Sequence, residues 1–308
     1  MRSTGSVSML SESHMVDRGL KLREDGSATI VLAAVACFAW GSHGYSTFAQ
    51  KDVESNLNTI ALELRDNLAP VLIAKIDGVE VPLQFDLGDR TPLILQRRAL
   101  DAIKAVPTGE SIKLQGTDGD FEVPTYKVPR VQIGDAVFTD VTARLDAPRV
   151  GYEPAQFARG YLGSGLLKSN AVVLDYAHHS MTLLRGEGAA LQELCRGTVV
   201  TFSVSSPKWR GEAVTESDTD FGRVTLWWDT GSPATALSKS ASHASHLPTS
   251  TEQVVTHRFM LGGSNFGPWP LNILNVSLPG FDGFIGDDFF KKHRVCIDFP
   301  GNRIVIGH

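Results

Sequence analysis

The sequence contains the same ordered set of elements twice, and this internal repeat constrains the fold more than any other feature. In the first half, a strand with alternating apolar residues at 79–85 runs directly into the turn Asp-Leu-Gly at residues 86–88. In the second half, an apolar strand at residues 223–228 runs into Asp-Thr-Gly-Ser at residues 229–232. One such turn alone would mean little, because Asp-x-Gly turns are common.

A second pair of matching segments follows farther along each half. Two apolar residues and a glycine end at Gly163 in the first half and at Gly286 in the second. A strand then ends in Asp175 or in Asp298, and the interval from glycine to aspartate is 12 residues in both halves. Another apolar strand begins six residues after each aspartate. Matched spacing over several elements predicts two structurally related units. We interpret the two aspartates as capping or solvent-side carboxylates.

The fold class follows from the repeat together with the composition. Short strands, turn signals and 29 glycines predict an all-β chain built from two related β-barrel-like lobes. Hydrophobic residues make up 42% and charged residues 20%, proportions that support a packed core. We expect an N-terminal lobe at residues 50–190 and a C-terminal lobe at residues 191–308. Helices are expected only at residues 97–105, 166–170, 189–194, 238–246 and 287–291.

The placement of one aspartate in each half favours a particular chemistry. A twofold arrangement of like units would bring Asp86 and Asp229 together, and two close carboxylates share a proton because they cannot both ionise cheaply. The ionised one can take a proton from water, and the protonated one can donate to a carbonyl oxygen. The sequence therefore predicts general acid–base attack on an amide. Gly88 and Gly231 suit these turns because glycine lets backbones approach closely.

These motifs resemble those of the aspartic peptidase superfamily, which includes pepsin and the retroviral proteases. The resemblance rests on the two turns and on the triplets that end at Gly163 and Gly286, and it covers about residues 65–308. It implies a bilobal fold with a cleft, an extended peptide as substrate and a β-hairpin flap near residues 111–119. The compact lobes are more similar to those of bacterial relatives. The implied site consists of Asp86 and Asp229 as the catalytic pair, supported by Gly88, Thr230, Gly231 and Ser232.

Two residues of the first turn depart from the family pattern, and the flap segment lacks a tyrosine. Leu87 replaces a threonine whose hydroxyl, in the family, bonds across to the other turn, and Asp89 replaces serine or alanine. Leu87 can instead pack between the lobes. Two functions therefore stay open: an aspartic endopeptidase with a variant first turn, or an inactive member of the fold that binds extended peptides. A third, less favoured, is a scaffold that presents surface loops to a partner.

The N-terminal region predicts export. An apolar run at residues 28–40 follows Lys21 and Arg23, and small residues ending at Ala49 come after it. This order is typical of a secretory signal peptide at residues 1–49, and the alternative is a signal-anchor that stays uncut. The run is short for a membrane span, which needs about 20 apolar residues. We expect a periplasmic or secreted protein that contacts a membrane only if this segment is retained.

Cysteines and charge restrict the remaining possibilities. Removal of Cys37 with the signal would leave Cys195 and Cys296, which could form a disulfide or could be two buried apolar residues. No Cys-x-x-Cys or Cys/His metal spacing occurs in the sequence, so we expect no metal and no cofactor. The net charge of −5 comes without a basic block, which argues against a nucleic-acid partner. A monomer is expected.

Overall fold

The computed structural model describes residues 57–65, 68–116, 119–146, 157–185, 191, 194–202, 213–241, 251–275 and 280–307. The predicted signal segment, residues 1–49, lies outside these ranges, as does residue 190 at the predicted boundary between the lobes. Within these ranges, no helix is long and apolar enough to cross a membrane.

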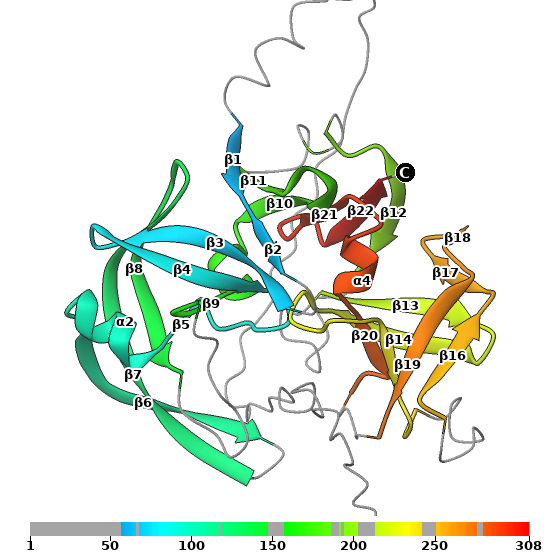
Figure 1. Ribbon diagram of the computed structural model, residues 1–308, viewed down its shortest axis with the longest axis horizontal. Coiled ribbons are helices and arrows are strands. Elements are labelled where there is room, and N and C mark those ends of the chain that lie inside the picture. The colour runs from blue at the N-terminus through cyan, green and yellow to red at the C-terminus, as the bar shows by residue number, and fades with distance from the viewer. Residues whose placement is uncertain are drawn as a thin grey trace, which may run out of the picture.

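Most of the regular structure consists of strands, which form three sheets (Figure 1). The first sheet has the order β2-β3-β4-β9-β5-β8-β7-β6. Its strands are β2 (Glu63–Arg65), β3 (Leu68–Ile76), β4 (Val79–Asp86), β5 (Leu93–Leu95), β6 (Val106–Gly116), β7 (Gly119–Ile133), β8 (Ala136–Leu145) and β9 (Gly160–Gly163). A second sheet of eight strands has the order β16-β19-β15-β20-β14-β13-β17-β18. Its strands are β13 (Val214–Thr219), β14 (Gly222–Trp228), β15 (Ala236–Ser238), β16 (Gln253–Thr256), β17 (Phe259–Leu261), β18 (Ser264–Asn265), β19 (Trp269–Leu274) and β20 (Gly283–Ile285).

The first two sheets repeat the same pairing pattern. β4 runs parallel to β9, which pairs antiparallel with β5, and β5 runs parallel to β8. The second sheet has the same relations among β14, β20, β15 and β19. Even the register agrees, because Phe85 lies opposite Leu162 and Trp228 lies opposite Ile285. The repeat seen in the sequence is therefore a repeat of structure, and the predicted all-β bilobal fold is confirmed.

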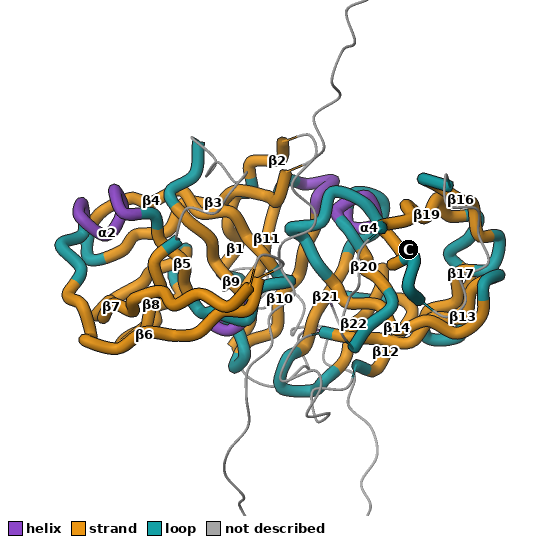
Figure 2. Tube along the Cα trace, turned by 90° about the horizontal axis from the view of Figure 1, so that it is seen from below, coloured by secondary structure: helices purple, strands orange, loops and turns teal. Residues whose placement is uncertain are grey.

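A six-stranded sheet joins the two lobes, between the other sheets in both views (Figures 1 and 2). Its order is β1-β11-β10-β21-β22-β12. The strands are β1 (Asn58–Ala61), β10 (Asn170–Asp175), β11 (Ser180–Arg185), β12 (Gly197–Thr201), β21 (Val295–Asp298) and β22 (Arg303–Gly307). At its centre β10 pairs antiparallel with β21, with Val172 opposite Ile297 and Leu174 opposite Val295. These two pairs exchange under the twofold relation of the repeat, so the lobes meet symmetrically.

Alternation along the strands that lead to the two turns explains where the core lies. Val81, Leu83 and Phe85 of β4 are buried, as are Val224, Leu226 and Trp228 of β14. Successive side chains of a strand point to opposite faces, so each strand directs one face into the core. Burial of one such large side chain stabilises the fold by about 1.5–3 kcal/mol. A single cluster of buried residues extends through both lobes.

Within the described residues, the two predicted helices that are found are shorter than expected, and residues 189–190 and 192–193 of the segment predicted at 189–194 lie outside those ranges. The predicted helices at 97–105 and 287–291 are found as α2 (Arg97–Ala102) and α4 (Asp287–Phe290). Only 3-10 turns occur near residues 166–170, namely η2 (Ser164–Leu166) and, farther on, η3 (Tyr176–His178). The prediction at 166–170 is wrong because Asn170 already pairs in β10. Ser238 likewise ends β15 instead of opening a helix, and residues 242–250 lie outside the described ranges.

The two aspartates at the ends of β10 and β21 have the same role. Asp175 Oδ1 accepts a hydrogen bond from the backbone N–H of His178 at 3.2 Å, and Asp298 Oδ1 accepts one from Gly301 at 2.9 Å. Each carboxylate therefore caps the turn that follows its strand, three residues on. This confirms the interpretation of both residues as capping groups.

Cys195 and Cys296 form a disulfide that ties the segment before β12 to the central strand β21. Both residues are also buried in a small apolar cluster on one face of the six-stranded sheet. Of the two alternatives left open by the sequence, pairing is the one found. The bridge closes a loop of 101 residues.

Candidate active site

The two Asp-x-Gly turns hold their aspartates in the same way. Asp86 ends β4 and Asp229 directly follows β14, and both side chains are buried. The N–H of Gly88 donates to Asp86 Oδ1 at 3.1 Å, and the N–H of Gly231 donates to Asp229 Oδ1 at 2.7 Å. Each carboxylate is thus fastened to the backbone of its own turn, two residues on.

The residue after each glycine continues this correspondence. The N–H of Asp89 donates to the carbonyl of Asp86, and the N–H of Ser232 donates to the carbonyl of Asp229, both at 3.2 Å. The carbonyl of Asp89 accepts from Ser164 and that of Ser232 accepts from Asp287, both at 2.7 Å. The segments that follow the two glycine triplets therefore support the two turns through equivalent backbone hydrogen bonds.

Thr230 links the second turn to the first. Its Oγ1 accepts a hydrogen bond from the N–H of Leu87 at 2.9 Å and donates one to the carbonyl of Phe85 at 2.8 Å. Thr230 is fully buried. The buried hydroxyl thus both donates to and accepts from the backbone on either side of Asp86. These two hydrogen bonds set the position of one turn relative to the other. The two turns are brought together as the repeat predicts.

Leu87 makes this link one-sided. It stands where the equivalent of Thr230 would be, and a leucine side chain can neither donate nor accept a hydrogen bond. Its side chain is 1% exposed and belongs to the cluster that extends through both lobes. Apolar packing therefore replaces one of the two cross-turn hydroxyls, as expected from the sequence.

Gly88 allows the closest approach between the turns. A Cβ atom at this position would lie 2.4 Å from Asp229 Oδ1 and 2.5 Å from Asp229 Cγ. Real side chains cannot tolerate such distances, so only glycine leaves room for the carboxylate. The Asp229 carboxylate therefore lies directly against the turn that carries Asp86. The other supporting residue, Ser232, donates from Oγ to the carbonyl of Ala234 at 2.9 Å, within its own loop.

A further buried carboxylate near this site was not predicted from the sequence as a site residue. Asp287, the first residue of α4, is buried, and burial raises its pKa, although the ammonium of Lys291 2.7 Å away opposes the shift. Tyr176 comes from the other lobe. Its pKa is raised well above the ordinary value, first by burial and then by the negative charges of Asp287 and Asp229. The available signal in the sequence is the position of Asp287 directly after Gly286, which by itself predicts only the start of a helix.

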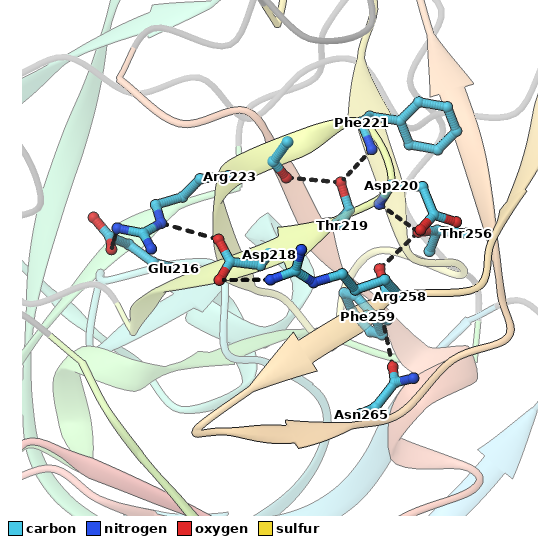
Figure 3. Close-up of polar contacts among 11 residues, drawn as sticks. Glu216, Asp218, Thr219, Asp220, Phe221, Arg223, Thr256, Arg258, Phe259 and Asn265 are labelled. Carbon is cyan, nitrogen blue, oxygen red and sulfur yellow. Dashed lines mark hydrogen bonds and ion pairs between the residues drawn. The ribbon is translucent and has the colours of Figure 1, made fainter.

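The far ends of the second lobe's strands are held by polar contacts (Figure 3). At the β13–β14 turn, Thr219 Oγ1 donates to the carbonyl of Gly222 and accepts from the N–H of Phe221. The N–H of Asp220 donates to Thr256 Oγ1 at 3.1 Å, which ties this turn to the end of β16. Asp218 contacts two arginines on the surface, and its hydrogen bond with Arg223 lowers its pKa. These contacts lie at the opposite end of β14 from Asp229 and fix the hairpin that carries it.

The hairpin expected at residues 111–119 is present. β6 and β7 pair antiparallel, with Ile112 opposite Val123 and Gly116 opposite Gly119. Residues 117–118, at its tip, lie outside the described ranges. No group of three or more His, Cys, Asp or Glu residues that could hold a metal occurs within those ranges.

The arrangement of lobes, turns and central sheet is similar to that of a solved enzyme, the aspartic proteinase from Irpex lacteus. The TM-score is 0.55, and the match covers 81% of this chain and 96% of that chain. The fold is that of the aspartic proteinases. At 13% sequence identity the likeness concerns the fold alone. No protein-family model matches the sequence, and no curated protein matches it either.

Proposed function

We propose that the chain is an aspartic endopeptidase-like hydrolase that cleaves extended peptides with Asp86 and Asp229. The observation that carries this proposal is the link between the turns. Thr230 bonds to the first turn, and the Asp229 carboxylate lies against Gly88. Two buried carboxylates on matched, joined turns are the arrangement that favours a shared proton.

The proposed mechanism assigns a distinct task to each carboxylate. The ionised member of the pair takes a proton from a water molecule as that water attacks the scissile carbonyl carbon. The protonated member donates its proton to the carbonyl oxygen, and the tetrahedral adduct then expels the amine. This shared-proton behaviour is well known for aspartic proteases, so the mechanism is carried over with the fold. It requires neither a covalent intermediate nor a bound cofactor.

The alternative function is an inactive member of the fold that binds extended peptides. The specific observation in its favour is Leu87, which leaves the first turn without a hydroxyl to bond across to the second. The alternative keeps the same binding region but assigns no chemistry to Asp86 and Asp229.

Cleavage of casein, an unstructured protein, assayed from pH 3 to pH 7, separates the two functions. The peptidase proposal expects fragments that accumulate at acidic pH and are suppressed by pepstatin. The matched control variant is Asp229→Asn, which should yield no fragments. Intact casein after prolonged incubation with the wild type would remove the peptidase proposal, and casein binding without cleavage would then support the alternative.

We also propose that the protein is exported and acts as a monomer. The Cys195–Cys296 disulfide supports export, because such bonds persist in oxidising compartments. Export predicts a mature N-terminus near Gln50. N-terminal sequencing of the protein from the periplasm or the medium tests this, and an intact N-terminus on membrane-bound protein would instead favour an uncut anchor.

A further inference from the structure

The first turn is joined to a buried ion pair that has no equivalent at the second turn. Asp89, the residue after Gly88, directs its Oδ2 at Nη2 of Arg144 on β8, at 3.0 Å. The two side chains are only 4% and 5% exposed. Buried ion pairs are poor stabilisers, because desolvation offsets most of their attraction. A contribution to stability therefore does not explain why Asp89 and Arg144 are charged at these two positions.

Asp89 is the residue through which several parts of the first lobe contact the turn. Its N–H donates to the carbonyl of Asp86, and its own carbonyl accepts from the N–H and the Oγ of Ser164. Its Oδ1 accepts from the N–H of Thr91 at 2.7 Å. Arg144 acts on the remaining carboxylate oxygen, so the guanidinium fixes the side chain whose backbone closes the Asp86 turn.

The second lobe provides an internal comparison. Ser232 occupies the position equivalent to Asp89 and makes the same two backbone hydrogen bonds, but its neutral hydroxyl donates to Ala234. The backbone of such a turn therefore does not need an ion pair. The two turns also differ in the cross-turn hydroxyl, which Thr230 has and Leu87 lacks. The ion pair therefore occurs at the first turn, where Leu87 makes no side-chain hydrogen bond to the other turn.

We infer that Arg144 is a positioning residue for the proposed catalytic pair. Acting through Asp89, it holds the turn that carries Asp86, in place of the hydroxyl that Leu87 lacks. This inference rests on the proposed function as far as catalysis is concerned. Arg144 makes no contact with the reacting atoms in this account. Its guanidinium suits the task, because Nη2 holds Asp89 while Nε donates to Thr91 Oγ1 and Nη1 donates to the carbonyl of Leu145, both at 3.4 Å. A lysine ammonium lacks this fixed set of donors.

Three variants test the inference by casein cleavage. Arg144→Met removes the charge that pairs with Asp89. Arg144→Met with Asp89→Ser removes both charges and copies the second turn's Ser232. The triple variant adds Leu87→Thr and restores a hydroxyl. We expect kcat of the single and double variants to fall by about tenfold to a hundredfold with KM little changed, because misplacement of a reacting group costs about this much. The triple variant should recover to within about threefold of the wild type.

The double variant separates positioning from mere charge compensation. If Arg144 only neutralises Asp89, removal of both charges should restore kcat together with the melting temperature, and this result would overturn the inference. Failure of the triple variant to exceed the double variant would overturn the link to the missing hydroxyl. The double variant also covers the case in which Arg144→Met fails to fold, because it removes both charges of the Asp89–Arg144 pair together.

Amide hydrogen exchange gives a readout that needs no activity. The amides of Leu87 and Gly88 bond to Thr230 Oγ1 and Asp86 Oδ1. In the double variant they should exchange about tenfold faster, whereas the Gly231 amide of the matched turn should not change. Equal acceleration at both turns, or none, would overturn the inference. If the wild type leaves casein intact while the double variant still shows this local acceleration, the proposed function is refuted and the positioning inference stands.

Discussion

The hydroxyl of Thr230 lies 2.9 Å from the backbone nitrogen of Leu87, a residue 143 positions earlier in the chain. The same hydroxyl donates to the carbonyl of Phe85. One buried side chain thus joins two turns that fold in different lobes. This link joins the two turns from one side only, because Leu87 cannot provide the reciprocal hydrogen bond.

Replacement of Thr230 by Val should therefore be costly for both stability and activity. The change keeps the shape of the side chain but leaves the Leu87 N–H and the Phe85 carbonyl without their buried partner, at about 1–3 kcal/mol for each orphaned group. The matched control is Thr230→Ser, which keeps the hydroxyl. Urea denaturation and casein cleavage measure the effects, and equal losses in the two variants would show that the hydroxyl is not the cause.

Replacement of Gly88 by Ala should displace the Asp229 carboxylate. The added methyl group would come within 2.4 Å of Asp229 Oδ1, so one of the two turns must shift. A shift of about 1 Å at a reacting group lowers turnover by about a hundredfold.

A double-mutant cycle checks that the Gly88→Ala effect comes from this contact. The loss of stability caused by Gly88→Ala should shrink when Asp229→Ala removes the carboxylate that the methyl group meets. Urea denaturation of the four proteins measures the coupling. Strictly additive losses would place the strain elsewhere in the turn.

Asp86→Asn and Asp229→Asn should each abolish casein cleavage while the protein stays folded. A shared-proton pair fails when either member loses its charge, so the double variant should be no worse than either single variant. Asp218→Asn, at a partly exposed carboxylate on the far end of the β13–β14 hairpin, is the control and should cleave normally. Cleavage that survives Asp86→Asn would falsify the two-aspartate mechanism.

Asp287 should make the protein less stable as the pH rises. Burial raises the pKa of this carboxyl in the folded state above its unfolded value, which is roughly 4. For an acid with a raised folded pKa, the stabilising contribution is fully present below the unfolded pKa and is lost as the pH rises through the folded pKa. The Asp287→Asn variant lacks this titration, so the melting temperature of the variant minus that of the wild type should increase from pH 4 to pH 7.

The Lys291→Met variant tests the same pH dependence by removing the group that lowers the Asp287 pKa. The ammonium of Lys291 opposes the upward shift of the Asp287 pKa. Its removal should therefore increase the loss of stability with rising pH. A difference between wild type and Asp287→Asn that stays constant across the pH range would contradict the assignment of the effect to this carboxyl.

Removal of the disulfide should destabilise the protein without changing the site. The bridge closes a loop of 101 residues, for which the loop-entropy model expects about 4–5 kcal/mol. Cys195→Ala with Cys296→Ala should lower the free energy of unfolding by about this amount, as measured in urea. Cys195 and Cys296 of the purified wild type should show no alkylation by iodoacetamide before reduction, and modification of both at that stage would contradict the bridge.

Features that depend on local patterns and on their repetition could be predicted from the amino-acid sequence. Alternation along β4 and β14 predicted strands that end at the two turns, because the two-residue period of a strand is visible in any single segment. The matched 12-residue intervals predicted related lobes, and with them the meeting of the two turns that carry Asp86 and Asp229. The complete Asp-Thr-Gly-Ser motif identified Thr230 as a supporting residue before its partners were known.

Pairing between side chains that are distant in the sequence could not be predicted in this way and is seen in the folded chain. The sequence left pairing of Cys195 and Cys296 open, and it gave no sign that Asp89 would meet Arg144, 55 residues away. The nearness of Asp287 to Tyr176 was equally hidden. Such partners are selected by the packing of strands from distant segments, and no periodicity within one segment records that choice. A buried charged group is stable only with a suitable neighbour, and the fold alone supplies that neighbour.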